Sequence, residues 1–197
     1  MTPAQRRLIV PIFALGLALV LLVATAWITL MNRPTSTGGA GAVGGSFALI
    51  NHDGGVITDR DMRGKPFLIF FGFTHCPDVC PAALMEISQV LEALGPDAKI
   101  SALFVSIDPE RDTPAALKDY VSNFDKRIIG VTGPRESINA VAKAYRVYHR
   151  KVPGENGEYT MDHSTVTYLM DRRGQFVNAV NLQRPAKDVA AELKPHL

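Results

Sequence analysis

Hydrophobic positions form one long uninterrupted stretch near the start of the chain and shorter patterned runs after it. Residues 8–31 contain no charged side chain, and a helix of this length would measure roughly 36 Å against a hydrocarbon core of about 30 Å. Arg6 and Arg7 precede the stretch and Arg33 alone follows it, and positive charge favours the cytoplasmic side of a membrane. We therefore expect a single transmembrane helix over 8–31, with residues 1–7 in the cytoplasm. A cleaved signal peptide fits less well, because its apolar region usually has about 7–15 residues.

The segment that follows, residues 32–45, consists mainly of glycine and of small or polar residues. Such a composition cannot build a core, and it predicts a flexible linker with a reach of roughly 20 Å. Residues 46–197 alternate between two hydrophobic patterns and predict one folded domain outside the cytoplasm.

Within 46–197, short apolar runs alternate with apolar residues at helical spacing. The continuous apolar run at 67–73 predicts a buried central strand, and 100–107 predicts a second one. Short runs at 47–50 and 56–58 predict a small hairpin. The other expected elements are helices over 84–94, 114–124 and 138–145, a strand over 128–131, an inserted loop over 151–162, an antiparallel pair over 165–170 and 175–180, and a last helix from Pro185. This order predicts an α/β fold: a thioredoxin-like mixed sheet flanked by helices, with an N-terminal hairpin and a loop insertion.

The formal charge of the chain is +2, and its excess of basic residues lies in the N-terminal part. Residues 1–45 contain three arginines and no acid, so the expected domain is close to neutral. A nucleic-acid-binding domain usually carries a basic face. We therefore expect no nucleic-acid partner.

The chain has only two cysteines, Cys76 and Cys80, which excludes a scaffold held together by disulfides. They lie four residues apart where a predicted strand passes into a predicted helix. At least one sulfur therefore meets a helix N-terminus, whose N–H groups favour a thiolate. The spacing is one residue wider than in the thioredoxin redox pair and leaves room for an ion. We expect a functional pair with a lowered thiol pKa rather than two buried structural cysteines.

A metal site with two thiolates needs a third ligand, and His163 is the best placed histidine. It follows the loop over 151–162 and precedes the predicted strand over 165–170, which would run beside the central strands. His75 neighbours Cys76, but adjacent residues at a tight turn rarely point at one ion. The alternative for His163 is a hydrogen-bonded loop histidine without a metal.

Three longer motifs resemble the signatures of the Sco/SenC family. They are FTHCPDVCP at 73–81, SIDPERDTP at 106–114 and YTMDHS at 159–164. Members of this family are copper-binding, thioredoxin-fold assembly factors that help to load the binuclear copper centre of cytochrome c oxidase subunit II. The resemblance implies one copper ion per chain, with Cys76, Cys80 and His163 as its ligands.

The chemistry of these three side chains agrees with copper. Cu(I) is soft and accepts two thiolates and an imidazole, whereas Cu(II) would require a fourth donor. Asp78, Asp162 or water could supply that donor. Asp78 could instead tune the thiols or cap the following helix, and Asp162 could hold His163 or be a solvated acid. Zinc, the main competing ion, usually takes four protein ligands in a structural site.

Two alternatives stay open at this point. The charged residues Asp108, Glu110, Arg111 and Asp112 either form a docking surface or order their turn by pairing, and pairing is the favoured interpretation. The cysteines would also suit a thiol–disulfide oxidoreductase that reduces the cysteines of a partner protein. We expect a metallochaperone rather than an enzyme, with such a reductase as the alternative.

A copper protein outside the cytoplasm would depend on partners. Cysteines there tend to form disulfides, which offer no thiolate, so we expect a thiol reductant and a copper donor in addition to subunit II. The N-terminus lacks the Arg- and Ser-rich stretch of a mitochondrial presequence. We therefore place the anchor in a bacterial inner membrane, with the domain facing the periplasm.

Overall fold

The structure is a computed structural model that describes residues 16, 19–25, 27 and 43–197. Most of the expected transmembrane stretch lies outside these residues, although 19–25 are helical and exposed. No helix in the described part of the chain is long and apolar enough to cross a membrane. The expected linker over 32–45 also lies mainly outside the described residues.

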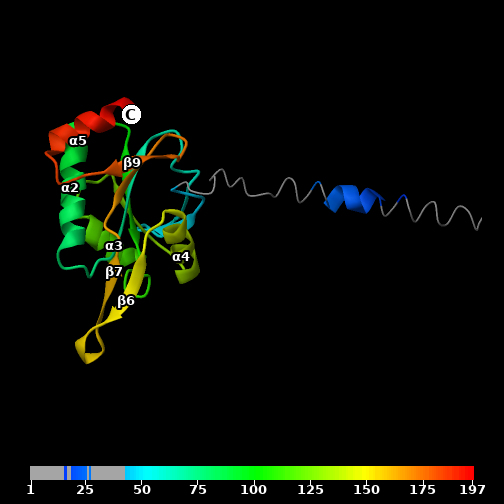
Figure 1. Cartoon of the computed structure of the whole chain (residues 1–197), viewed down its shortest axis with the longest axis horizontal. Helices are drawn as coiled ribbons and strands as arrows, with labels where there is room; N and C mark the ends of the chain where they lie inside the picture. The colour runs from blue at the N-terminus through cyan, green and yellow to red at the C-terminus, as the bar shows by residue number, and fades with distance from the viewer. Residues whose placement is uncertain (1–15, 17–18, 26, 28–42) are drawn as a thin grey trace, which may run out of the picture. The chain divides into compact units, whose positions relative to one another are not determined.

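The C-terminal domain is built on a mixed sheet of seven strands (Figure 1). Its two central strands, β3 and β4, are parallel and buried at every position, as expected for the two predicted buried strands. The strands, in spatial order, are β2 (Val56–Thr58), β1 (Ala48–Asn51), β5 (Ile128–Thr132), β4 (Ser101–Ser106), β3 (Phe67–Gly72), β8 (Thr167–Met170) and β9 (Phe176–Val180). The expected N-terminal hairpin is β1–β2, which joins the sheet by antiparallel pairing of β1 with β5.

Helices cover both faces of this sheet (Figure 1). Alternate residues of a strand point to opposite faces, so Phe70 stacks on Phe104 while Phe71 packs against Tyr145, which directly follows the helix α4 (Arg135–Ala144). The connections from β3 to β4 and from β4 to β5 both step toward the same side of the sheet. Because such connections are right-handed, the helices within them, α2 and α3, lie on the same face. The helices are α2 (Val79–Leu94), α3 (Pro114–Val121), α4 (Arg135–Ala144) and α5 (Ala186–Leu193), of which α5 packs on α2.

The inserted segment is not a loop, and this expectation was wrong. Strands β6 (His149–Pro153) and β7 (Tyr159–His163) form a separate antiparallel pair, joined by a short helical turn η1 (Glu155–Gly157). This hairpin, the β6–β7 arm, projects from the domain (Figure 1). Most of its side chains are exposed and Met161 is buried.

The topology brings three chain segments to one edge of the sheet. Parallel β3 and β4 end there, and the loops after their last residues, Gly72 and Ser106, start side by side. Strand β8 runs the other way and pairs its first residue, Thr167, with Phe70, so the residues before β8 arrive at the same edge. This edge is the usual place for a functional site in an α/β sheet.

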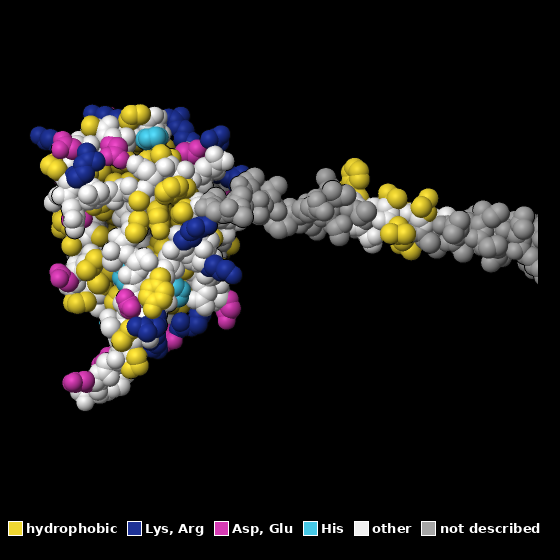
Figure 2. All heavy atoms as spheres, in the orientation of Figure 1, with side chains coloured by type: hydrophobic (Ala, Val, Ile, Leu, Met, Phe, Trp, Pro, Cys, Tyr) yellow, Lys and Arg dark blue, Asp and Glu magenta, His cyan; other side chains and the backbone are white. Residues whose placement is uncertain are grey.

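The face of the domain that Figure 2 shows carries charged side chains of both signs. On the face in view, basic and acidic side chains are interspersed rather than gathered by sign (Figure 2). This arrangement agrees with the nearly neutral charge of the domain.

Candidate metal centre

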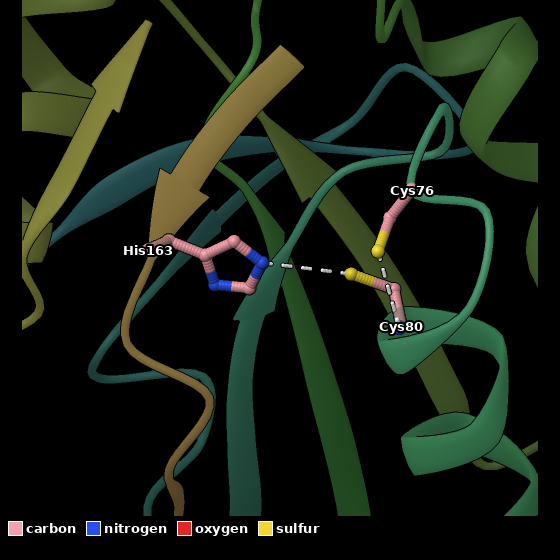
Figure 3. A group of neighbouring side chains, drawn as sticks. All are labelled: Cys76, Cys80 and His163. Carbon is pink, nitrogen blue, oxygen red and sulfur yellow. Dashed lines mark hydrogen bonds between the residues drawn. The ribbon is translucent and has the colours of Figure 1, made fainter. Parts of the chain in front are cut away.

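The cysteine pair lies between the end of β3 and the start of α2. Helix α2 begins at Val79, so Cys80 lies in its first turn, while Cys76 lies in the preceding loop (Figure 3). Both thiols are free; Cys80 is fully buried and Cys76 is half-buried. The backbone N–H of Cys80 points at the sulfur of Cys76, 3.4 Å away. The expectation that a sulfur meets a helix N-terminus is therefore confirmed for Cys76.

The expected lowering of the thiol pKa is wrong for Cys80. Burial raises the pKa of this thiol well above its usual value, and the backbone hydrogen bond involving Phe73 only partly opposes that effect. A buried thiolate lacks the water that would otherwise solvate its charge. A bound cation would supply the missing compensation, because metal binding displaces the proton of a coordinating thiol into solvent.

Gly72 makes room for the buried sulfur, a role that the sequence did not reveal. A Cβ at this position would lie 2.7 Å from the Cys80 sulfur and 2.8 Å from the Phe104 ring. Both distances are shorter than any van der Waals contact. The side chain of Cys80 therefore occupies the space that only glycine leaves open at the end of β3.

His163 is the last residue of β7 and turns its ring toward the cysteines (Figure 3). Its Nε2 lies 3.8 Å from the Cys80 sulfur, and its Nδ1 lies 2.9 Å from the carbonyl oxygen of Ser164. A carbonyl only accepts, so Nδ1 carries the proton and Nε2 presents its lone pair to the sulfurs. The edges of Phe70 and Phe73 support the ring, with centroids 6.4 and 5.8 Å away.

The three side chains form a compact donor set. The sulfurs of Cys76 and Cys80 and one nitrogen of His163 all lie within 4.8 Å of one another. First-row metals bind sulfur at about 2.3 Å and imidazole nitrogen at about 2.0 Å, so donors of one ion lie within about 4.6 Å of each other. The set therefore fits a metal ion after small side-chain movements.

The two aspartates considered as helpers lie elsewhere. Asp78 precedes α2, but its side chain makes no capping hydrogen bond, and it is exposed. Asp162 is exposed and lies 3.5 Å from Arg150; the carbonyl of Ser164, rather than Asp162, holds the ring of His163. The structure therefore places neither carboxylate on the three donors.

Within the charged turn after β4, the expected pairing is present for Arg111, whereas Asp112 and Glu110 contact residues of other segments. Arg111 donates through Nε to Asp108 at 2.5 Å, and Asp112 is fully buried. Glu110 forms ion pairs with Arg135 and Lys151.

Comparison with known proteins identifies the family. The family model described as SCO1/SenC matches residues 35–197. The chain belongs to the SCO1/SenC family. Its matched segment contains the complete Cys–Cys–His set, so the donor geometry described above is that of a SCO1/SenC domain.

Several relatives are similar over most of this segment. The human mitochondrial protein SCO1 homolog is 41% identical over 161 residues, which cover 79% of this chain and 53% of that protein. The chain spans about half the length of the first curated relatives it matches. Bradyrhizobium japonicum ScoI, solved with copper bound, is 54% identical with a TM-score of 0.77, covering 79% of this chain and 100% of that one. Yeast Sco1 with copper bound is 36% identical with a TM-score of 0.72, covering 79% and 88%.

Proposed function

We propose that this protein is a membrane-anchored copper chaperone that binds one copper ion through Cys76, Cys80 and His163. The observation that carries the proposal is the convergence of these three donors within 4.8 Å in a family whose solved members include copper-bound structures. Two sulfurs and one imidazole nitrogen form a soft donor set that suits Cu(I).

The surroundings of the donors support delivery as well as binding. Cys80 lies in the core, whereas Cys76 is half-buried and its neighbours Pro77, Asp78 and Val79 are exposed. An acceptor protein can therefore approach the ion from the Cys76 side. Ligand exchange would start at this sulfur, while Cys80 and His163 still hold the ion.

The receiving partner in this proposal is cytochrome c oxidase subunit II, whose binuclear copper centre the protein would help to load. One solved relative, BsSco, is named as a member of the Sco family of cytochrome c oxidase assembly proteins. A thiol reductant and a copper donor complete the expected set of partners. We place the protein in the inner membrane by residues 8–31, with the domain in the periplasm, because this stretch is uncharged and preceded by two arginines.

An anaerobic Cu(I) titration of the reduced full chain in detergent, against a competing chelator, tests the proposal. We expect one tightly bound copper ion, and strongly reduced affinity in Cys76→Ser, Cys80→Ser and His163→Ala. His196→Ala is the matched control, because this histidine lies beside the C-terminus and is not one of the three donors. Wild-type protein without a tight copper ion, or a His163→Ala variant of unchanged affinity, would contradict the assignment.

Thiol–disulfide exchange is the second candidate function, favoured by one observation. The sulfur of Cys76 is only half-buried and accepts a hydrogen bond from the N–H of Cys80, so a partner's disulfide can reach it. Burial raises the pKa of the Cys80 thiol, which argues against Cys80 as the attacking nucleophile. Rapid exchange of the reduced pair with a dithiol partner, in a protein that binds no copper, would favour the reductase.

A further inference from the structure

The turn between β4 and α3 contains two buried carboxylates. Asp108 is 2% exposed and Asp112 is 0% exposed, although both belong to a strongly charged segment at the edge of the sheet. A buried carboxylate is costly unless hydrogen bonds compensate it. The groups that compensate these two belong to different halves of the metal centre.

Asp112 holds the cysteine loop. Its Oδ2 accepts hydrogen bonds from the backbone N–H of Thr74, at 3.0 Å, and from the hydroxyl of Ser106, at 2.6 Å. Its Oδ1 accepts a hydrogen bond from the hydroxyl of Thr74 at 2.6 Å. Thr74 lies two residues before Cys76, so these bonds fix the backbone from which the cysteine loop departs.

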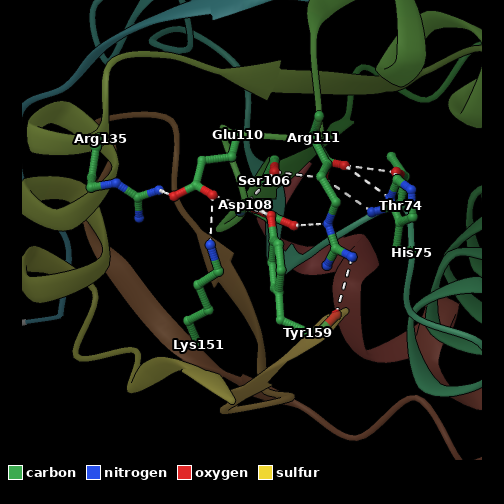
Figure 4. A network of polar contacts seen from close by, with 10 residues as sticks. Thr74, His75, Ser106, Asp108, Glu110, Arg111, Arg135, Lys151 and Tyr159 are labelled. Carbon is green, nitrogen blue, oxygen red and sulfur yellow. Dashed lines mark hydrogen bonds and ion pairs between the residues drawn. The ribbon is translucent and has the colours of Figure 1, made fainter. Parts of the chain in front are cut away.

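Asp108 holds the strand that carries the histidine. It accepts hydrogen bonds from Arg111 Nε, at 2.5 Å, and from the hydroxyl of Tyr159, at 2.9 Å (Figure 4). Arg111 also donates through Nη1 to the carbonyl of Tyr159 at 3.1 Å, and its guanidinium lies 3.8 Å from the centre of the Tyr159 ring. Tyr159 is the first residue of β7, and His163 is the last.

The β6–β7 arm needs such contacts because its strands pair only with each other. It forms its own sheet and shares no ladder with the seven-stranded one. Its position against the domain therefore depends on side-chain contacts. Tyr159 contributes a stacked ring and two hydrogen-bonded groups, and Lys151 of β6 adds an ion pair with Glu110 (Figure 4).

We infer that Asp112 and Asp108 are positioning residues, each of which holds one half of the metal centre. Asp112 acts through Thr74 on the cysteines, and Asp108, with Arg111, acts through Tyr159 on His163. The inference rests on the proposed copper site. Copper ligation by Cys76, Cys80 and His163 does not explain the charged residues of the motif at 106–114. The inference gives two of them, Asp108 and Asp112, a role.

The test measures Cu(I) affinity, by chelator competition, for Tyr159→Phe and Thr74→Val in two backgrounds, wild-type and His163→Ala. In the wild-type background we expect each substitution to lower the affinity about 10- to 100-fold, as loss of groups that orient metal ligands does. In the His163→Ala background, Tyr159→Phe should change the affinity by less than about twofold, because the residue through which it acts is gone. Thr74→Val should keep its full effect there, because the cysteines remain.

X-ray absorption of the copper complexes gives an independent readout. Tyr159→Phe should lose part of the nitrogen contribution and keep both sulfurs, which a general loss of stability would not produce. Tyr148→Phe and Thr160→Val are the matched controls and should leave the copper affinity unchanged. Both residues are exposed; Tyr148 directly precedes β6 and Thr160 lies in β7. Asp112→Asn and Asp108→Asn complete the series where they fold.

The outcomes separate this inference from the function on which it rests. A wild-type protein that binds no copper overturns the proposed function. A wild-type protein that binds copper through His163, but in which Tyr159→Phe lowers affinity equally in both backgrounds, overturns the inference alone. Equal effects would mean that Tyr159 acts on the whole domain rather than on His163.

Discussion

At the scale of single residues, the metal centre depends on Gly72, which has no side chain. Gly72→Ala would place a methyl group 2.7 Å from the Cys80 sulfur and 2.8 Å from the Phe104 ring. Neither neighbour can yield freely inside a packed core, so we expect a loss of about 1–3 kcal/mol in the free energy of unfolding. Because the displaced atom is a donor, copper affinity should fall as well.

Urea unfolding and copper titration of this variant measure both effects. Gly55→Ala is the control, since its nearest neighbour would be the Asn51 side chain at an ordinary 3.4 Å. Unchanged copper affinity in Gly72→Ala would show that the position of the Cys80 sulfur does not matter to the site.

Residue chemistry explains which parts of the centre could be predicted from sequence. Cys76, Cys80 and His163 are recognisable because thiol and imidazole groups carry metal chemistry in any fold. Gly72 and Asp112 escape such reasoning, because their importance comes from contacts with residues far away in the chain. The interpretation of Asp162 rested on its closeness to His163 in sequence, but adjacent residues of a strand point to opposite faces.

At the scale of elements, the central strands and helices could be predicted while the β6–β7 arm could not. Strands β3 and β4 are buried on both faces, so their sequences are apolar except for the two serines at the ends of β4. The arm buries few side chains: in β7 only Met161 is buried, and in β6 none is. Its sequence reads as a polar loop with a glycine-containing turn. Hydrophobic periodicity reports burial, and it therefore misses strands that bury little.

The turn of the arm allows a prediction about its stability. Gly157 has a φ of +81°, and a Cβ added there would meet no atom within 4 Å, so Gly157→Ala adds backbone strain of about 1–2 kcal/mol without a clash. Because the arm forms its own sheet, the strain should raise amide hydrogen exchange in β6 and β7 only. Exchange measured by mass spectrometry checks this.

Gly174→Ala provides the matched control. This glycine has a φ of +76° at the turn between β8 and β9, and a Cβ there would also meet no atom within 4 Å. The substitution should raise exchange in those strands and leave the arm unchanged. Faster exchange across the whole domain in Gly157→Ala would show that the arm is not an independent unit.

At the scale of the whole molecule, the described core lies entirely within the C-terminal domain. Buried apolar residues run from Phe47 to Leu193, and the donors of the metal centre lie among them. Two residues before the expected boundary also contact this domain: Val43 packs against the core, and the N–H of Gly44 donates to the carbonyl of Ala144 at 2.9 Å. These contacts bear on how a soluble fragment should be cut.

We expect fragments 43–197 and 46–197 both to fold and to bind copper, because neither lacks a donor or a residue that holds one. The free energy of unfolding should be about 1 kcal/mol lower for the shorter fragment, because it lacks the hydrogen bond from Gly44 to Ala144 and the packing of Val43. Urea unfolding compares the two, and Val43→Ser in the longer fragment separates packing from hydrogen bonding. If both fragments aggregated or unfolded without a cooperative transition, the domain would depend on residues 1–42, and the proposed division into anchor, linker and copper-binding domain would be wrong.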